Sequence, residues 1–269
     1  MPARIEFPES HPHVAIVVLD RPRHANALDL ETLRDLAGHW HRINRDDSVR
    51  VAVLTGAGGR IFCAGMEMKK TIPVSQAHAR GERLDEADFE GLRAIPHATL
   101  VRDPLRVPLI AAVNGHARAG GFDLMLAAQL RFAVPHATFA LEEVALGLYP
   151  TGQASVLLPR QIGAVHAAEL LYTAQPIEAA RALEIGLLNE VVDASELMPR
   201  ALRAADQIAA NAPLAVQATL RGVRALEGLD LETAYTRQEE FGRPLRATED
   251  AREAQRAFVE KRAPRFVGR

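Results

Sequence analysis

Residues 109–129 read LIAAVNGHARAGGFDLMLAAQ, and this stretch contains the transition on which the predicted fold depends. It opens with a short apolar run, 109–113, which is typical of a buried strand, and Asn114-Gly115 ends the run with a turn signal. Residues 122–129 then have the apolar content of a helix that begins just after a pair of glycines. A buried strand followed closely by a helix indicates an α/β protein.

The start of this predicted helix combines two adjacent glycines with a carboxylate. The first N–H groups of a helix have no partner within the helix, and the helix dipole favours negative charge there. Gly120 and Gly121 let another group approach the backbone closely, so they predict a place where an anionic oxygen is bound. Asp123 is either an acid of the reaction or an ordinary first-turn acid stabilised by the dipole.

A second bend of small residues occurs at 61–67, IFCAGME, after a predicted strand and a glycine-rich turn at 56–59. Small side chains at Cys63, Ala64 and Gly65 leave the backbone open to close approach, and a bend leaves N–H groups free to donate. Two such bends with one donor each would form an oxyanion hole. Two ordinary turns at strand ends would explain the same residues without any site.

Two further acids, Glu142 and Glu143, follow a predicted short strand at 138–141. Carboxylates that converge with Asp123 near an oxyanion hole would suit proton transfer next to a carbonyl group. The alternative for Glu142 and Glu143 is a solvated strand end without a catalytic role.

Other catalytic patterns are weaker or absent. His116 could act as a base, although a packed or solvated histidine is the better explanation. Ser155 lacks the G-x-S-x-G context of a hydrolase nucleophile, and the glycines of 56–59 match neither a dinucleotide-binding nor a P-loop spacing. No ligand spacing suggests a metal site, and the single cysteine, Cys63, is most simply a small buried side chain.

The composition is that of a globular protein with a sizeable core. The 269 residues are 48% hydrophobic and 25% charged with a net charge of −2, so no basic field points to nucleic acid or an anionic membrane. One cysteine excludes an intrachain disulfide, which fits a reducing interior. The first residues have no apolar core of signal-peptide length, and no apolar run approaches ~18 residues. We therefore expect a cytoplasmic protein.

The chain divides into an α/β part and a helical part. The expected strands are 14–19, 49–55, 109–113, 130–134, 138–141 and 188–192, and the expected helices are 28–43, 122–129, 159–175 and 177–186. The polar stretch 67–105 is expected to be a mobile helical excursion beside the site. From residue 195 onward the pattern is helical, with Pro213 in a first turn and Thr248 as an N-cap. We therefore expect an α/β core at 1–195 and a helical region at 196–269.

Several of these motifs together resemble the crotonase superfamily, the enoyl-CoA hydratase/isomerase family. The resemblance is carried by RPRHANAL at 21–28, IFCAGMEMK at 61–69, VNGHARAGGFDLMLAAQLRFA at 113–133, ATFALEEVALGLYP at 137–150 and FVEKRAPRFVGR at 258–269. It implies a crotonase-like spiral of ββα units with a C-terminal helical trimerisation region, and trimers or dimers of trimers. It also implies an acyl-CoA thioester as ligand, with no metal and no separate cofactor, because CoA is part of the substrate.

The same resemblance implies roles for individual residues. The family's oxyanion hole falls on the N–H groups of Met66 and Gly120, and Gly121 would keep the helix start bare enough for the ligand to approach. The stretches around Asn26 and after Met66 resemble those that hold the pantetheine and adenine parts of CoA. The residues expected to contact CoA are Ala25, Ala27, Ala64, Lys69 and Lys261, the last across a subunit boundary.

Hydratases of this family use two acids, whose positions fall on Asp123 and Glu143. Glu143 matches in type, whereas Asp123 stands where glutamate is usual, and the usual three glycines appear as Ala119-Gly120-Gly121. An aspartate places its oxygens about 1 Å farther back, and a displacement of this size can cost on the order of 10²-fold in rate. Hydration of a 2-enoyl-CoA is our first hypothesis. Isomerisation by Glu143 alone, other acyl-CoA chemistry (lyase, decarboxylase or hydrolase) and acyl-CoA binding without turnover stay open.

Overall fold

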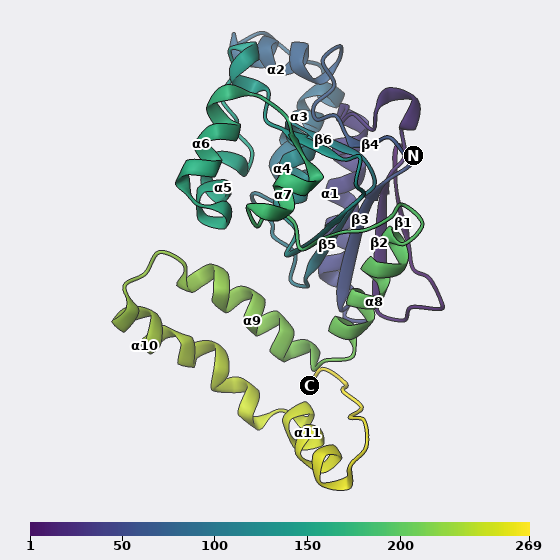
Figure 1. Cartoon of the computed structure of the whole chain (residues 1–269), viewed down its shortest axis with the longest axis vertical. Coiled ribbons are helices and arrows are strands. Elements are labelled where there is room, and N and C mark those ends of the chain that lie inside the picture. Colours follow the sequence, from purple (N-terminus) through teal and green to yellow (C-terminus); the bar gives the residue numbers. More distant parts are fainter.

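The computed structural model describes all 269 residues, and its core is built on a six-stranded sheet (Figure 1). In spatial order the strands are β1 (Ala3–Glu6), β2 (Val14–Leu19), β3 (Val51–Gly56), β5 (Leu109–Val113), β7 (Leu130–Ala133) and β10 (Glu190–Val191). Strand β1 runs antiparallel to β2, and every other neighbouring pair is parallel. All residues of β2, β3 and β5 are buried, as expected for a parallel sheet covered on both faces.

Helix α1 (Leu30–Arg45) packs on one face of this sheet and is covered in turn by α3 (Glu86–Ala98). The apolar side chains of α1 recur three to four residues apart, which gives the helix one buried face. The indole N–H of Trp40 donates to the carbonyl of Ala98 at 2.8 Å and so ties α3 to α1. The polar stretch 67–105 therefore contains two helices, α2 (Thr71–Ala79) and α3, and the second is anchored on the core.

Helix α8 (Leu197–Ala209) lies on the opposite face of the sheet (Figure 1). Ala201 and Ala205 are fully buried and belong to the same hydrophobic core as the strands. Small side chains let the helix lie close to the sheet. The core therefore continues to about residue 209, beyond the boundary expected at residue 195, because the alanine face of α8 packs on the sheet and not on the later helices.

A smaller sheet places the two glycine-containing bends side by side. It contains β4 (Ile61–Cys63), β6 (His116–Arg118), β8 (Thr138–Ala140) and β9 (Ile177–Glu178), in that order. Because β4, β6 and β8 are parallel, the segments that follow them emerge at the same edge of the sheet. These segments are the bend at 64–66, the start of α4 (Gly120–Leu126) and the acids at 142–143.

Some element boundaries differ from those expected from the sequence. In place of one helix over 159–175, the chain forms α5 (Ala154–Ile162) and α6 (Ala164–Thr173), because Gly163 between them has a φ of +82° and ends the right-handed helix. The helix expected over 177–186 is also shorter than predicted: its first two residues form β9, and only α7 (Ala179–Glu184) is helical. Strands β1, β4 and β6 are not predicted from the sequence; β4 and β6 lie in the two stretches interpreted as glycine-containing bends, and β1 has only four residues.

Three helices after α8 lie apart from the core (Figure 1). They are α9 (Pro213–Leu226), α10 (Leu231–Gly242) and α11 (Glu249–Glu260), with a short 3-10 turn, η3 (Pro244–Ala247), before the last. The predicted helix starts are confirmed, because Pro213 occupies the first turn of α9 and Thr248 accepts the N–H of Ala251 at 3.1 Å. A cavity of about 940 Å³, lined in part by Leu157 and Val223, separates α9 from the core.

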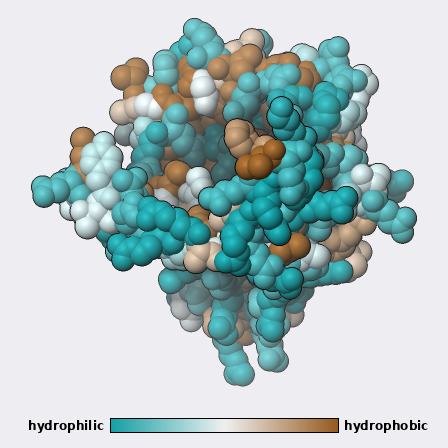
Figure 2. Space-filling view, turned by 90° about the horizontal axis from the view of Figure 1, so that it is seen from below, coloured by the Kyte–Doolittle hydropathy of each residue, from teal (hydrophilic) through white to brown (hydrophobic).

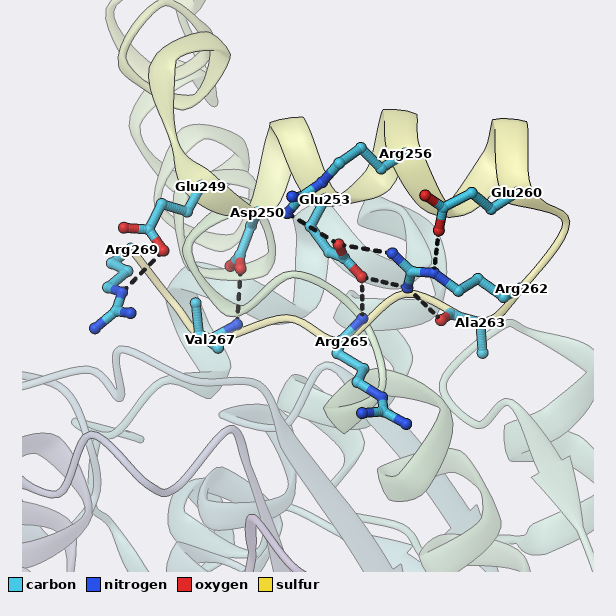
Figure 3. A network of polar contacts seen from close by, with 10 residues as sticks. All are labelled: Glu249, Asp250, Glu253, Arg256, Glu260, Arg262, Ala263, Arg265, Val267 and Arg269. Atoms are coloured by element: carbon cyan, nitrogen blue, oxygen red, sulfur yellow. Dashed lines mark hydrogen bonds and ion pairs between the residues drawn. The ribbon is translucent and has the colours of Figure 1, made fainter.

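The C-terminal tail folds back along α11 and is held by acids of that helix (Figure 3). Glu253 accepts hydrogen bonds from the guanidinium of Arg262 at 2.6 and 3.0 Å and from the backbone N–H of Arg265 at 2.9 Å. Asp250 accepts the two successive N–H groups of residues 267–268 at 2.7 and 2.9 Å. The tail is therefore fixed by charge-assisted hydrogen bonds, which are stronger than neutral ones.

The contact between this C-terminal unit and the core is narrow. Arg50, just before β3, donates to the carbonyls of Ala209 at 2.9 Å and Phe266 at 2.8 Å. Seen from the C-terminal side, the surface is mostly hydrophilic with separate hydrophobic groups (Figure 2). The exposed apolar side chains of the three helices are Val223, Leu231, Tyr235, Phe258 and Val259.

The Glu253 network predicts a pH-dependent contribution to stability. Hydrogen bonds from Arg262 and from the N–H of Arg265 lower the pKa of Glu253 from 4.5 to about 2. Because the pKa is lower in the folded state, the stabilisation is complete above about pH 4.5 and is lost as the pH falls through about 2. Glu253→Gln should therefore lower the thermal midpoint at pH 7, and the difference from wild type should shrink between pH 4.5 and pH 2.

Calorimetry of both proteins across this pH range measures the effect. Glu90→Gln is the matched control, because Glu90 is an exposed glutamate of α3 without an ion pair, and it should leave the midpoint unchanged. A Glu253→Gln protein as stable as wild type at pH 7 would contradict the assignment.

Candidate active site

The N–H of Met66 is held where it can donate to a bound oxygen. The N–H of Leu28 donates to the carbonyl of Gly65 at 2.8 Å, and the N–H of Glu67 donates to the carbonyl of Leu28 at 3.0 Å. Successive residues of such a strand-like pairing turn their N–H groups to opposite sides, so the N–H of Met66 points away from Leu28 and has no acceptor in the protein. Gly65 makes the bend with a φ of +85°, a region that favours glycine.

Gly120 lies beside this free N–H. A Cβ added to Gly120 would lie 3.6 Å from the backbone nitrogen of Met66, so the two backbones are neighbours. Gly120 is the first residue of α4, where an N–H has no partner within the helix, and Ala119 turns the chain into the helix with a φ of +44°. An oxygen placed between the two N–H groups would accept two hydrogen bonds, which is the arrangement of an oxyanion hole.

Gly121 has a different role from the one expected. A Cβ at Gly121 would lie 2.6 Å from the Cβ of Cys63 and would collide with the carbonyl oxygen of that residue. The absence of a side chain therefore lets α4 lie against β4 and brings Met66 and Gly120 together; the space is not left open for a ligand. Burial raises the pKa of the Cys63 thiol to about 12, so this thiol is an unreactive packing group.

Asp123 is almost fully buried, with 3% of its surface exposed, and its carboxylate sits at the N-terminus of α5. Its Oδ1 atom accepts the N–H groups of Gln153 at 2.7 Å and Ala154 at 2.8 Å, whereas Oδ2 accepts no hydrogen bond from the protein. Any side chain at Gly152 would collide with this carboxylate. Burial raises the pKa of Asp123 to about 6, although the two N–H donors act in the opposite direction. Asp123 thus combines a helix-capping oxygen with a free one.

Glu143 begins the short 3-10 helix η2 (Glu143–Leu146) just after β8. Its Oε2 atom is buried and has no hydrogen-bond partner. Burial raises the pKa of Glu143, its own backbone N–H lowers it, and the charges of Asp123 and Glu142 raise it further. The two acids are therefore close enough to influence each other. A pair of acids with raised pKa values is suited to proton transfer near neutral pH.

Glu142 is engaged in a different cluster. Its carboxylate lies 3.2 Å from the guanidinium of Arg118, which also donates to the hydroxyl of Thr138 at 2.9 Å. That hydroxyl contacts Nδ1 of His116 at 2.9 Å. Burial lowers the pKa of His116, and neighbouring cationic groups lower it further. His116 and Glu142, the two other candidates from the sequence, are thus bound to each other's neighbours on the small sheet. Glu143 is the acid whose buried oxygen has no hydrogen-bond partner.

The loop expected to hold CoA is built on two residues in the left-handed conformation. Ala25 and Asn26 have φ values of +54° and +52°. The side-chain amide of Asn26 donates to the carbonyls of Ala57 at 3.0 Å and Ile61 at 2.9 Å. The N–H of Ala64 donates to the carbonyl of Ala25 at 3.1 Å, so this loop lies directly beside the bend that carries Met66.

The two lysines expected to contact CoA are not brought together within one chain. Lys69 is exposed just before α2, and Lys261 is exposed where α11 ends, at the far end of the molecule (Figure 1). A site that used both would need Lys261 of a second copy. Ala27 is buried, and its carbonyl accepts the guanidinium of Arg21 at 2.6 Å.

Two groups of residues at the site are missed by reasoning from the sequence. Gly152 and Gln153 shape the surroundings of Asp123, and the Pro-Thr-Gly turn before α5 is the only local signal for them. The second group is a buried cluster in which Arg21 lies 3.0 Å from Asp29 and 2.7 Å from Glu67. Arg21 and Glu67 are far apart along the chain, so no pattern in the sequence indicates that they form an ion pair.

Other functional classes find little support in the geometry. The hydroxyl of Ser155 donates to the carbonyl of Pro150 at 3.3 Å and has no histidine partner. No three His, Cys, Asp or Glu side chains are grouped so that they could hold a metal ion. None of the helices combines the length and the apolar content needed to cross a bilayer.

Several known proteins are similar to this chain in both sequence and fold. The family model described as enoyl-CoA hydratase/isomerase matches residues 9–269. The enoyl-CoA hydratase EchA19 of Mycobacterium tuberculosis is 39% identical over 97% of this chain and 96% of its own, and the (E)-benzylidenesuccinyl-CoA hydratase of Thauera aromatica is 38% identical over 100% of both. The crystal structure of an enoyl-CoA hydratase from Bacillus anthracis matches with a TM-score of 0.89 at 33% identity, covering 100% of both chains. The expected crotonase-like fold is thereby confirmed, and this chain belongs to the enoyl-CoA hydratase/isomerase family.

Proposed function

We propose that this protein is an enoyl-CoA hydratase, which adds water across the double bond of a 2-enoyl-CoA thioester. The observation that carries the proposal is the pair of acids with raised pKa values, the buried Asp123 and the half-buried Glu143, at the sheet edge that also carries two neighbouring N–H groups. The relatives support it, since two of them have hydratase in their names.

The N–H groups of Met66 and Gly120 would bind the thioester oxygen. When water attacks the β-carbon, the electrons of the double bond move toward the thioester, and negative charge develops on this oxygen. Fixed donors stabilise that charge without having to reorganise, and one such donor is worth about 3 kcal/mol in measured cases. A thioester bound here needs no metal to polarise it, so we propose that the reaction uses no cofactor apart from the CoA of the substrate.

The two acids would move the protons. The Oδ2 atom of Asp123, in its ionised form, takes a proton from the attacking water as the bond from oxygen to the β-carbon forms. Glu143, in its protonated form, gives a proton to the α-carbon as the enolate collapses, and burial favours this form by raising its pKa. Proton transfer by a positioned side chain contributes about 10²–10⁴-fold in rate.

A second function, double-bond isomerisation, is favoured by one observation. The Oδ1 atom of Asp123 accepts two backbone N–H groups at the start of α5, so the residue has a structural task as well. If this task were its only one, Glu143 alone could carry a proton between two carbons of the acyl chain. The two hypotheses differ in what they require of Asp123.

Binding of CoA and assembly of the protein complete the proposal. We place the CoA moiety along the loop with Ala25 and Ala27, beside Ala64, with Lys69 as a point charge for a phosphate. Lys261 would come from a neighbouring subunit of a trimer or dimer of trimers. The exposed apolar side chains of α9 to α11 would be available for contacts in such an assembly. A cytoplasmic location stays a prediction.

The loss of 2-enoyl thioester absorbance tests the proposed function directly. The wild-type protein should hydrate at least one member of a series of 2-enoyl-CoA thioesters of increasing chain length. Glu143→Gln should lose at least about 10²-fold in kcat, because the amide cannot donate a proton in the same way, while acyl-CoA binding persists. Glu142→Gln is the matched control, since this neighbour is paired with Arg118 and should keep kcat within about threefold. Full activity of Glu143→Gln would overturn the assignment.

Asp123→Asn separates the hydratase from the isomerase. The amide oxygen can still accept the two N–H groups of α5, so the cap persists while the carboxylate is lost. For a hydratase with Asp123 as base, kcat/KM of the wild type should fall about tenfold per pH unit below the pKa of about 6. The variant should have much lower activity, and its kcat/KM should no longer show this decrease. An isomerase that relies on Glu143 alone would keep its activity in the variant.

The stability of the same variant provides a check. The pKa of Asp123 is higher in the folded protein, so its ionisation opposes folding; this cost is absent below about pH 3.8 and complete above about pH 6. Asp123→Asn should therefore be more stable than wild type at pH 8, by roughly 3 kcal/mol. A variant that loses both activity and stability would point to a structural role.

Gly120→Ala tests the oxyanion hole. The nearest atoms to an added Cβ are 3.5 and 3.6 Å away, so the methyl group fits, but it lies beside the nitrogen of Met66 where the oxygen is expected to bind. We expect kcat to fall about 10²–10³-fold with no loss of thermal stability. Gly38→Ala, in an open position of α1, should leave kcat unchanged. Normal kcat in Gly120→Ala would show that the oxygen binds elsewhere.

A further inference from the structure

Arg21 is a buried cation between the proposed CoA loop and the Met66 bend. Only 11% of its side chain is exposed. Its guanidinium donates to the carbonyl of Ala27 at 2.6 Å and lies 3.0 Å from the carboxylate of Asp29 and 2.7 Å from that of Glu67. None of these contacts belongs to the acids or to the N–H donors described above, so the role of Arg21 is still to be explained.

Glu67 depends on Arg21 more than Asp29 does. Asp29 also accepts the N–H and hydroxyl of Thr32 and lies 3.7 Å from the ammonium group of Lys70. Glu67 has Arg21 as its only ion-pair partner, its side chain is 15% exposed, and its Oε2 atom is buried without a hydrogen bond of normal geometry. Without Arg21, Glu67 would be an unpaired buried carboxylate.

This carboxylate is directly next to the proposed oxyanion donor. Glu67 follows Met66 in the chain, and bond lengths keep its carboxylate within about 10 Å of the Met66 nitrogen. Negative charge that develops on the thioester oxygen would be repelled by an unpaired anion at this distance. For a partly buried pair of charges, the repulsion corresponds to a rate loss of roughly 10–100-fold.

Arg21 also holds both sides of the pairing that aims the donor. It contacts Ala27, one residue before Leu28, and Glu67, one residue after Met66. Leu28 and Met66 are the two residues of the bridge that turns the Met66 N–H toward Gly120. A displacement of about 1 Å at such a donor can cost on the order of 10²-fold.

We propose that Arg21 is a positioning residue of the oxyanion hole: by neutralising Glu67 and tying it to the Ala27 carbonyl, Arg21 keeps the Met66 N–H effective as a donor to the thioester oxygen. This inference rests on the proposed oxyanion hole but does not depend on the role of Asp123. The charge on Glu67 is the part of the arrangement that a substitution can remove without disturbing the backbone.

The carbonyl stretching frequency of bound butyryl-CoA, measured by isotope-edited infrared spectroscopy, reports the strength of the oxyanion hole without turnover. Wild-type protein should shift this frequency to a lower wavenumber, and the absence of any shift would contradict the proposed function itself. Arg21→Met should reduce the shift and lower kcat about 10–100-fold, with KM changed less than about threefold. Arg34→Met, at an exposed arginine of α1 without an ion pair, should leave both kcat and the shift unchanged.

Rescue distinguishes neutralisation from simple structural support. Glu67→Gln should keep kcat within about threefold, because the amide oxygen can still accept from Arg21. Arg21→Met combined with Glu67→Gln should recover the part of kcat and of the carbonyl shift that the unpaired anion removes, while the part that depends on the tie to the Ala27 carbonyl stays lost. Arg21→Lys keeps a positive charge near Glu67 and should retain at least a tenth of the activity.

The inference fails if Arg21→Met keeps full kcat and the full carbonyl shift, or if the double variant recovers neither. If Arg21→Met does not fold, Arg21→Lys and the double variant carry the test. A folded lysine variant that binds butyryl-CoA without polarising its carbonyl, or a folded double variant without the shift, would overturn the inference equally.

Discussion

The parallel pairing of β4 with β6 is the constraint on which the candidate site depends. It fixes the two bends that follow these strands at one edge of the small sheet, and the missing side chain of Gly121 lets α4 lie against Cys63. Only then are the N–H groups of Met66 and Gly120 neighbours. A side chain at position 121 would separate the two N–H groups without altering either bend, so the geometry of the candidate site depends on packing as much as on the bends.

Burial sets the chemistry of the acids. Asp123 and Glu143 lie close enough to interact, and in both cases desolvation is the largest cause of the raised pKa. Asp123 also has a structural role, because the first N–H groups of α5 need an acceptor and its Oδ1 atom accepts two of them. The shorter side chain at this position is thus accommodated by a helix N-terminus that approaches it, and Gly152 leaves the room for this approach. In the proposed hydratase, catalysis and helix capping would be tasks of the same carboxylate.

The buried charges follow a common physical rule. Asp29 and Glu67 are almost inaccessible to water, and Arg21 lies between them and compensates both. In the C-terminal unit, Glu253 is compensated in the same way by Arg262, and there the charges hold the tail of the chain in place. Because the core meets this unit through few contacts, the arrangement of α9 to α11 is governed by their own hydrogen bonds and by whatever packs on their exposed apolar side chains.

The sequence by itself determined the α/β class, the strands at 14–19 and 109–113, the starts of α9 and α11, and the family, because continuous apolar runs, cap residues and ordered motifs are local properties of the chain. It could not detect β4 and β6 beside their glycine-containing bends, the packing of α8 on the core, or the break at Gly163. Only the tertiary structure decided that Gly121 serves packing, that Asp123 caps α5, and that Arg21 faces Glu67. Each of these depends on residues far apart in sequence that meet only when the sheets form, and periodicity along the chain contains no information about such contacts.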